Sequence, residues 1–147
     1  MSPVAGARHA ARMDLDRGPR GAPGGPAERR SVVVADDSAA VRQAMVDLIQ
    51  TDTNFAVVAE AADATDAIDA ARSLQPDIAV LDVHMPGGGG PEAAARIREA
   101  APATRVVAYS AFDDAFSRDA MAQAGAVAYA VKGRDALLDV LRDVSAG

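Results

Sequence analysis

The sequence predicts an α/β fold with five parallel strands in the order 2-1-3-4-5 and helices on both faces of the sheet. From Ser31 onward, short β-branched runs alternate with Ala-rich stretches of helical length, which is typical of a parallel sheet. The chain has 147 residues, half of them apolar, so it has room for one domain with an ordinary core. Right-handed crossovers leave few arrangements for five such strands, and this order suits a short chain.

The expected elements follow one another from residue 31 to the end. Strands are expected at Val32–Ala35, Phe55–Ala59, Ile78–Leu81, Arg105–Tyr109 and Val127–Val131. Helices are expected at about Ala39–Ile49, Ala64–Leu74, Pro91–Glu99, Asp113–Ala124 and Asp135–Val144. Ser38 is a natural N-cap for the first helix, Pro91 suits the first turn of the third, and Gly125 is expected to end the fourth.

Residues 1–30 differ in composition from the rest and are predicted to be a disordered tail, with residues 31–147 as the folded domain. The tail is rich in Gly, Pro and Arg and has no periodic apolar pattern. We interpret it as a solvated extension; contact of its Arg residues with an acidic partner or a membrane surface is the alternative. Met13 is a second candidate start.

Charge and cysteine content restrict the classes of function. The net charge is −6: residues 1–30 carry +3, so residues 31–147 carry −9. The Arg residues of this acidic part are scattered along the sequence. An acidic body argues against direct nucleic-acid binding, which needs clustered Lys and Arg. There is no Cys, no apolar run long enough to span a bilayer and no signal-peptide h-region. We therefore expect a cytoplasmic protein that does not enter the membrane.

Three carboxylates follow two strands that the predicted order makes neighbours. Asp36 and Asp37 come directly after the first strand, and Asp82 comes directly after the third. In open parallel sheets, ligands bind beyond the carboxyl ends of the strands where the strand order reverses, which here is between these two strands. One Asp after a strand is a common turn or cap residue, but three together need a counter-charge. The all-oxygen donor set favours Mg²⁺.

Two further polar residues are expected at the same sheet edge. Ser110 follows the fourth strand and Lys132 follows the fifth. A hydroxyl donor and an ammonium group are what phosphoryl chemistry needs when catalysis consists mainly of positioning and charge stabilisation, and a carboxylate can itself be the nucleophile. Taken singly, Ser110 also suits loop capping and Lys132 a solvated surface charge.

Together these segments resemble the response-regulator receiver domain. The stretches GGGGPEAAARIREA (87–100) and AVAYAVKG (126–133) are similar to those of receivers in LuxR-type regulators. The resemblance is carried by VVVADDS (32–38), LDVHMP (81–86), YSA (109–111) and YAVK (129–132). It covers residues 31–147 and implies a flavodoxin-like (βα)5 fold. It also implies that Asp82 is the phosphoacceptor and that Mg²⁺ is bound by Asp36, Asp37, Asp82 and the backbone carbonyl of His84.

The resemblance assigns roles to the neighbouring residues as well. It implies that Ser110 and Lys132 bind the phosphoryl oxygens, and that Ser110 and Tyr129 form a switch in which Ser110 moves toward the phosphate and Tyr129 turns inward. By analogy, His84 and Phe112 at the mouth tune the lifetime of the phosphate. Many receivers have Pro after the Lys, whereas this chain has Gly133, so a looser loop is expected there.

The implied function is signal relay in a two-component system. A histidine kinase or phosphotransfer protein would donate the phosphoryl group, and an unidentified protein would read the altered surface. The sequence ends soon after the fifth expected helix, so we expect a stand-alone receiver that is not itself a turnover enzyme, with a truncated LuxR-type transcriptional regulator as the alternative. The segments Asp113–Ala124, Val127–Val131 and Asp135–Val144 are the expected partner face and a candidate homodimer face.

Two alternatives from other classes remain at this point. A Mg²⁺-dependent phosphohydrolase of the haloacid-dehalogenase type would also use an aspartyl-phosphate, but it places a second Asp two residues after the nucleophile. That position is His84 here, which argues against this class. A binding module whose acidic pocket is a relic is the other alternative.

Overall fold

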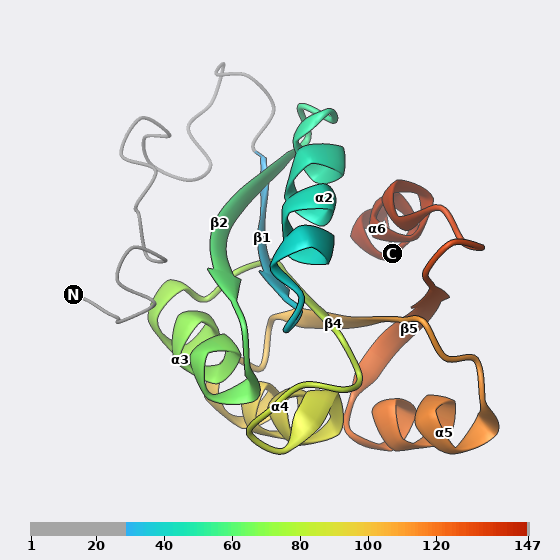
Figure 1. The fold of residues 1–147 in the computed structure, drawn as a ribbon. Coiled ribbons are helices and arrows are strands. Elements are labelled where there is room, and N and C mark those ends of the chain that lie inside the picture. Colours follow the sequence, from blue (N-terminus) through green and yellow to red (C-terminus); the bar gives the residue numbers. More distant parts are fainter. Residues whose placement is uncertain (1–28, 147) are drawn as a thin grey trace.

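The computed structural model describes residues 29–146, which form one five-stranded sheet covered by helices (Figure 1). The strands are β1 (Arg30–Ala35), β2 (Phe55–Ala61), β3 (Ile78–Leu81), β4 (Arg105–Ser110) and β5 (Ala126–Val131). The helices are α2 (Ala39–Gln50), α3 (Ala64–Leu74), α4 (Gly89–Ala100), α5 (Ala115–Gln123) and α6 (Leu137–Ala146). All strand pairs are parallel and their order is β2-β1-β3-β4-β5, which confirms the predicted topology.

The sheet is buried on both faces, because alternate side chains of each central strand pack on opposite layers. Ile78 and Val80 of β3 lie in the core beneath α2 and α6, whereas Ala79 and Leu81 lie in the core beneath α3, α4 and α5. Figure 1 shows the same division of the helices into two layers. A strand buried on both faces must be apolar at every position, and this explains why β3 reads as a continuous apolar run.

Two of the expected caps are present. The Ser38 hydroxyl accepts a hydrogen bond from the Val41 N–H (3.2 Å) at the start of α2. Gly125 follows the last turn of α5 with φ = +111°, a backbone conformation that favours glycine. Ser38 therefore marks the start of α2 and Gly125 the end of α5, as the sequence predicts.

Three helices begin at other residues than predicted. Helix α4 begins at Gly89, two residues before Pro91, which still lies in the first turn. Helix α5 begins at Ala115 and not at Asp113, because Asp114 is the N-cap and accepts from the Ser117 N–H at 2.9 Å. Helix α6 begins at Leu137, two residues after Asp135, whose carboxylate accepts from the Val131 N–H at 2.8 Å and so belongs to the preceding turn.

The predicted disordered tail lies outside the described residues except for its last two members. Arg30 is the first residue of β1, one position before the predicted domain boundary. Among residues 29–146, no helix is both long and apolar enough to cross a bilayer.

Candidate functional site

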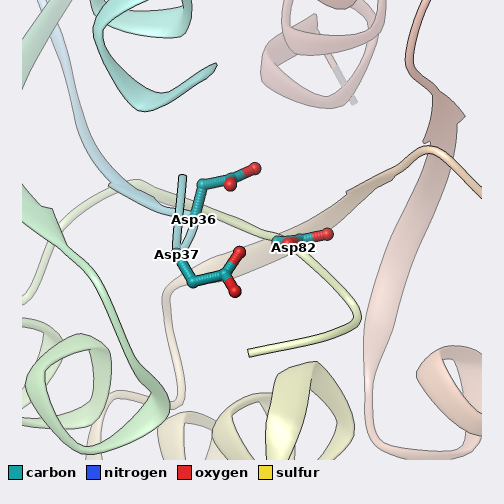
Figure 2. A group of neighbouring side chains, drawn as sticks. All are labelled: Asp36, Asp37 and Asp82. Atoms are coloured by element: carbon teal, nitrogen blue, oxygen red, sulfur yellow. The ribbon is translucent and has the colours of Figure 1, made fainter. Parts of the chain in front are cut away.

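The topology brings Asp36, Asp37 and Asp82 together at the carboxyl edge of the sheet. Strands β1 and β3 are neighbours in a register that pairs Ala35 with Leu81, the residues just before Asp36 and Asp82. The Asp82 N–H donates to the Ala35 carbonyl at 2.9 Å, which holds the two strand ends side by side. Each carboxylate offers an oxygen within 4.8 Å of the other two, and Figure 2 shows the three side chains pointing to the same side.

Burial and like charge make this pocket costly to ionise. The exposed fractions of Asp36 and Asp82 are 1% and 7%, whereas Asp37 is exposed. The pKa of Asp82 is raised mainly because burial removes water from its carboxylate, and the charges of Asp36 and Asp37 add to this effect. Lys132 and the backbone N–H of His84 oppose it. A carboxyl group in such a pocket is a candidate functional group.

Lys132 supplies a positive charge to the pocket. Its Nζ lies 2.5 Å from Asp36 Oδ2 and 3.5 Å from Asp82 Oδ1, and its side chain is mostly buried. The residue follows β5, and its backbone N–H donates to the Ser110 carbonyl at 2.8 Å. The structure therefore brings together the Lys and Ser positions that the sequence places after separate strands.

Ser110 and Tyr129 are joined through one residue of the β4–α5 connection. Ser110 is fully buried, and its hydroxyl accepts a hydrogen bond from the Phe112 N–H at 3.0 Å. The Tyr129 hydroxyl donates to the Phe112 carbonyl at 2.7 Å, while the Arg118 guanidinium lies 4.7 Å from the Tyr129 ring centroid. The backbone of Phe112 thus links the two residues expected to form a switch.

His84 and Phe112 lie beside each other in the connections that follow β3 and β4. Their rings meet edge to face with centroids 4.8 Å apart. His84 is exposed, and 55% of Phe112 is accessible to water. A cleft of about 620 Å³ opens beside Asp37 and is lined in part by His84 and by Phe116, which is 84% exposed.

An ion pair between Arg134 and Asp113 joins the loops after β4 and β5, which sequence reasoning missed. The Asp113 carboxylate accepts from Arg118 Nε at 2.5 Å and from Arg134 Nη1 at 2.6 Å. Arg134 also pairs with Asp135 at 3.2 Å. Gly133 has φ = +81° and open space around it, and the next residue, Arg134, joins its loop to Asp113. The closeness of Asp113 to Ser110 and of Arg134 to Lys132 in the sequence was the signal available.

Arg42 is another residue that sequence reasoning missed. Its Nη1 donates to the backbone carbonyl of Asp36 at 2.7 Å, and its Nε pairs with Glu60 Oε1 at 3.3 Å. The available signal in the sequence was that Arg42 follows Asp36 by six residues, with the helix cap Ser38 between them.

The donor set suits a hard divalent cation. Asp36, Asp37 and Asp82 offer carboxylate oxygens and no nitrogen or sulfur ligand, as Mg²⁺ prefers. The pocket that they form lies at the reversal of strand order, where ligands bind in folds of this class.

The sequence also matches the family model described as response regulator receiver domain, over residues 32–142. The chain belongs to this family. Receiver domains are parts of two-component systems. The chain is 36% identical over 118 residues to the transcriptional regulatory protein YxjL of Bacillus subtilis, covering 79% of this chain and 54% of that protein.

Solved receiver structures agree with the fold of this one. The signal receiver domain of NarL from Mycobacterium tuberculosis superposes with a TM-score of 0.78 at 31% identity, covering 83% of this chain and 99% of that one. A LuxR-family response regulator from Aurantimonas sp. SI85-9A1 gives a TM-score of 0.77 at 34% identity, covering 81% and 86%. The chain spans about half the length of curated relatives such as YxjL and GacA of Pseudomonas aeruginosa.

Proposed function

We propose that this receiver domain accepts a phosphoryl group on Asp82 from a histidine kinase or phosphotransfer protein and relays the signal to a protein partner. The observation that carries the proposal is the mostly buried Asp82 carboxylate, which lies within 4.8 Å of two further carboxylates and 3.5 Å from the Lys132 ammonium. Asp36, Asp37, Asp82 and the His84 carbonyl are the proposed Mg²⁺ ligands. Bound there, Mg²⁺ would neutralise charge on the carboxylates and on the phosphoryl oxygens.

The chemistry assigns a separate task to each remaining side chain. An Asp82 oxygen attacks the phosphorus while the P–N bond of the donor phosphohistidine breaks and the imidazole leaves. Lys132, already 3.5 Å from Asp82, stabilises the negative charge of the transferred phosphoryl group, and the Ser110 hydroxyl donates a hydrogen bond to it. The pocket thus contributes mainly position and charge.

The two hydrogen bonds at Phe112 support a switch that involves Ser110 and Tyr129. In this proposal the Ser110 hydroxyl leaves the Phe112 N–H as it moves toward the phosphoryl group, and the Tyr129 hydroxyl leaves the Phe112 carbonyl as its side chain turns inward. We infer that phosphorylation breaks both bonds together and so reshapes the β4–α5 connection. His84 and Phe112 limit the access of water to Asp82 and set the lifetime of the phosphate.

The partner face is proposed to lie on α5, β5 and α6. Phe116 and Val127 are exposed on α5 and β5, and exposed apolar side chains of this kind suit a protein partner or a homodimer. We propose a cytoplasmic relay protein with no catalytic turnover of its own and no direct nucleic-acid contact. Because the chain matches about half of a transcriptional regulatory protein, the second candidate is the receiver part of a LuxR-type regulator.

A phosphorylation assay tests the proposal. The full chain is incubated with acetyl phosphate and MgCl₂, and intact mass spectrometry measures the gain of one phosphoryl group. We expect the wild type and Asp47→Asn, an exposed carboxylate on α2, to gain it, and Asp82→Asn to gain none. A wild type that gains no phosphoryl group would favour the relic binding module, and an Asp82→Asn variant that gains as much as the wild type would refute Asp82 as the phosphoacceptor. Sustained turnover of a phosphomonoester would favour the phosphohydrolase.

A further inference from the structure

We propose that Arg42 is a positioning residue for the metal site: its guanidinium holds the β1–α2 connection in the shape in which Asp36 and Asp37 present their carboxylates to a divalent cation. The inference rests on the proposed function, because it concerns the same site. Arg42 itself faces the backbone of that connection and not the cation, so its effect is indirect.

The guanidinium connects three elements at once. Arg42 lies in the first turn of α2, where its N–H donates to the Ser38 carbonyl at 2.9 Å. Its Nη1 donates to the Asp36 carbonyl at 2.7 Å, and its Nε pairs with Glu60 of β2 at 3.3 Å. Only 19% of the Arg42 side chain is exposed, so water competes weakly for these donors. A rigid fork with several donors suits such a bridge better than an ammonium group.

The carbonyl of Asp36 is the point of the connection that Arg42 controls. The Asp36 side chain has its own partners, since Oδ1 accepts from the Ser38 N–H at 2.9 Å and Oδ2 from Lys132 at 2.5 Å. The Asp36 carbonyl belongs to the peptide that leads into Asp37, and within residues 29–146 Arg42 supplies its hydrogen bond. Holding this peptide plane sets the direction in which the exposed Asp37 leaves the backbone.

Positioning and simple electrostatics predict opposite effects of removing Arg42. The positive charge of Arg42 repels a nearby cation, so its loss on electrostatic grounds alone would tighten Mg²⁺ binding. Loss of a partner that orients metal ligands weakens binding instead, by about 10- to 100-fold in known metal sites. A side chain that only ties α2 to the sheet would change stability and leave Mg²⁺ affinity as it is. The sign of the change therefore separates the three roles.

The test is a titration of the metal-free full chain with MgCl₂, followed by ¹H–¹⁵N NMR. Arg42→Met is expected to weaken Mg²⁺ binding by about tenfold. Arg42→Lys keeps the charge but cannot span the Asp36 carbonyl and Glu60 together, so any weakening in this variant reports geometry alone. Arg72→Met on α3 removes the same charge from an exposed i, i+3 pair with Asp69 and is expected to bind Mg²⁺ as the wild type does.

The outcomes separate this inference from the proposed function. If the wild type shows no Mg²⁺-dependent shifts, the metal site itself is wrong, and the role of Arg42 is overturned with it. If the wild type binds and both Arg42 variants bind equally well or more tightly, the metal site stands and the positioning role is overturned. If Arg42→Met does not give a dispersed native spectrum, Arg42→Lys decides: weaker binding supports the role, and unchanged binding refutes it.

Discussion

Substituting the proposed phosphoacceptor should stabilise the metal-free receiver domain. We expect Asp82→Asn to raise the free energy of unfolding at neutral pH without Mg²⁺, because the wild-type pocket crowds three carboxylates around one ammonium. The amide has nearly the same shape as the carboxylate and carries no charge. Lys132 retains Asp36 as its partner in the variant.

The distances set the size of the effect. Each of the two neighbouring carboxylates lies within 4.8 Å of Asp82, and at that limit and an effective dielectric constant of about 20 it repels Asp82 by about 3.5 kcal/mol, whereas Lys132 at 3.5 Å attracts it by about 4.7 kcal/mol. The difference is a net repulsion of about 2 kcal/mol. Solvent around the exposed Asp37 reduces this value, while burial of Asp82 increases it. We therefore expect a stabilisation of about 1–2 kcal/mol.

The pH dependence of the stability follows from the raised pKa of Asp82, because burial disfavours the charged form of its carboxyl group. Between the unfolded value of 3.8 and the raised folded pKa, the folded state binds more protons. The stability of the wild type therefore falls as pH rises through this window. The advantage of Asp82→Asn should be absent below the window and complete above it.

Urea unfolding in EDTA, followed by far-UV circular dichroism, measures this effect. Asp47→Asn is the control: its carboxylate lies exposed on α2 and accepts from Gln43 at 2.8 Å, so its change should stay within about 0.5 kcal/mol. Added Mg²⁺ should stabilise the wild type more than Asp82→Asn, because the ion binds the folded carboxylates. An Asp82→Asn variant that is less stable than the wild type at neutral pH without metal would refute the reasoning.

Three further predictions concern the surroundings of the site. Gly90→Ala places a Cβ 2.6 Å from the Asp82 carbonyl oxygen and 2.9 Å from the Val83 Cα. This overpacking should lower the free energy of unfolding, measured in urea, by about 1–3 kcal/mol. A neutral or stabilising result would contradict the prediction. Hydrogen bonds from Arg118 and then Arg134 lower the pKa of Asp113, so the stability that Asp113 contributes is present above its unfolded value of 3.8 and is lost as pH falls through the folded pKa. Asp113→Asn should be less stable than the wild type at neutral pH and should converge with it in acid, whereas a constant difference in urea unfolding across pH would argue against these ion pairs. Tyr129→Phe removes the hydroxyl that donates to the Phe112 carbonyl in the β4–α5 connection. It should lower the free energy of unfolding by about 0.5–1.5 kcal/mol and speed amide hydrogen exchange in that connection. Unchanged exchange would show that the hydrogen bond does not hold the loop.

Local patterns account for the parts of the structure that the sequence predicted. Short β-branched runs alternating with Ala-rich stretches determined the parallel sheet, because only a strand buried on both faces is apolar at every position. Asp36 and Asp82 were predicted to meet because carboxyl ends of neighbouring parallel strands share one edge, and their loops are short. Ser38 was predicted as a cap because that interaction lies within one turn of helix.

Contacts between distant segments could not be predicted in this way. Asp113 and Asp114 are equally good caps by themselves, and Asp114 caps α5 while Asp113 binds Arg134, which lies 21 residues away in sequence. The bridge from Arg42 to Glu60 depends in the same way on the packing of α2 beside β2.

The sequence by itself therefore determined the family, the strand order and the edge of the sheet at which the acidic pocket forms, since periodicity and strand-end chemistry are local. Only the tertiary structure decided which donor serves which acceptor there: Lys132 between Asp36 and Asp82, and Phe112 between Ser110 and Tyr129. Hydrogen bonds depend on tenths of an ångström, and those distances arise only when all five strands and their helices have packed.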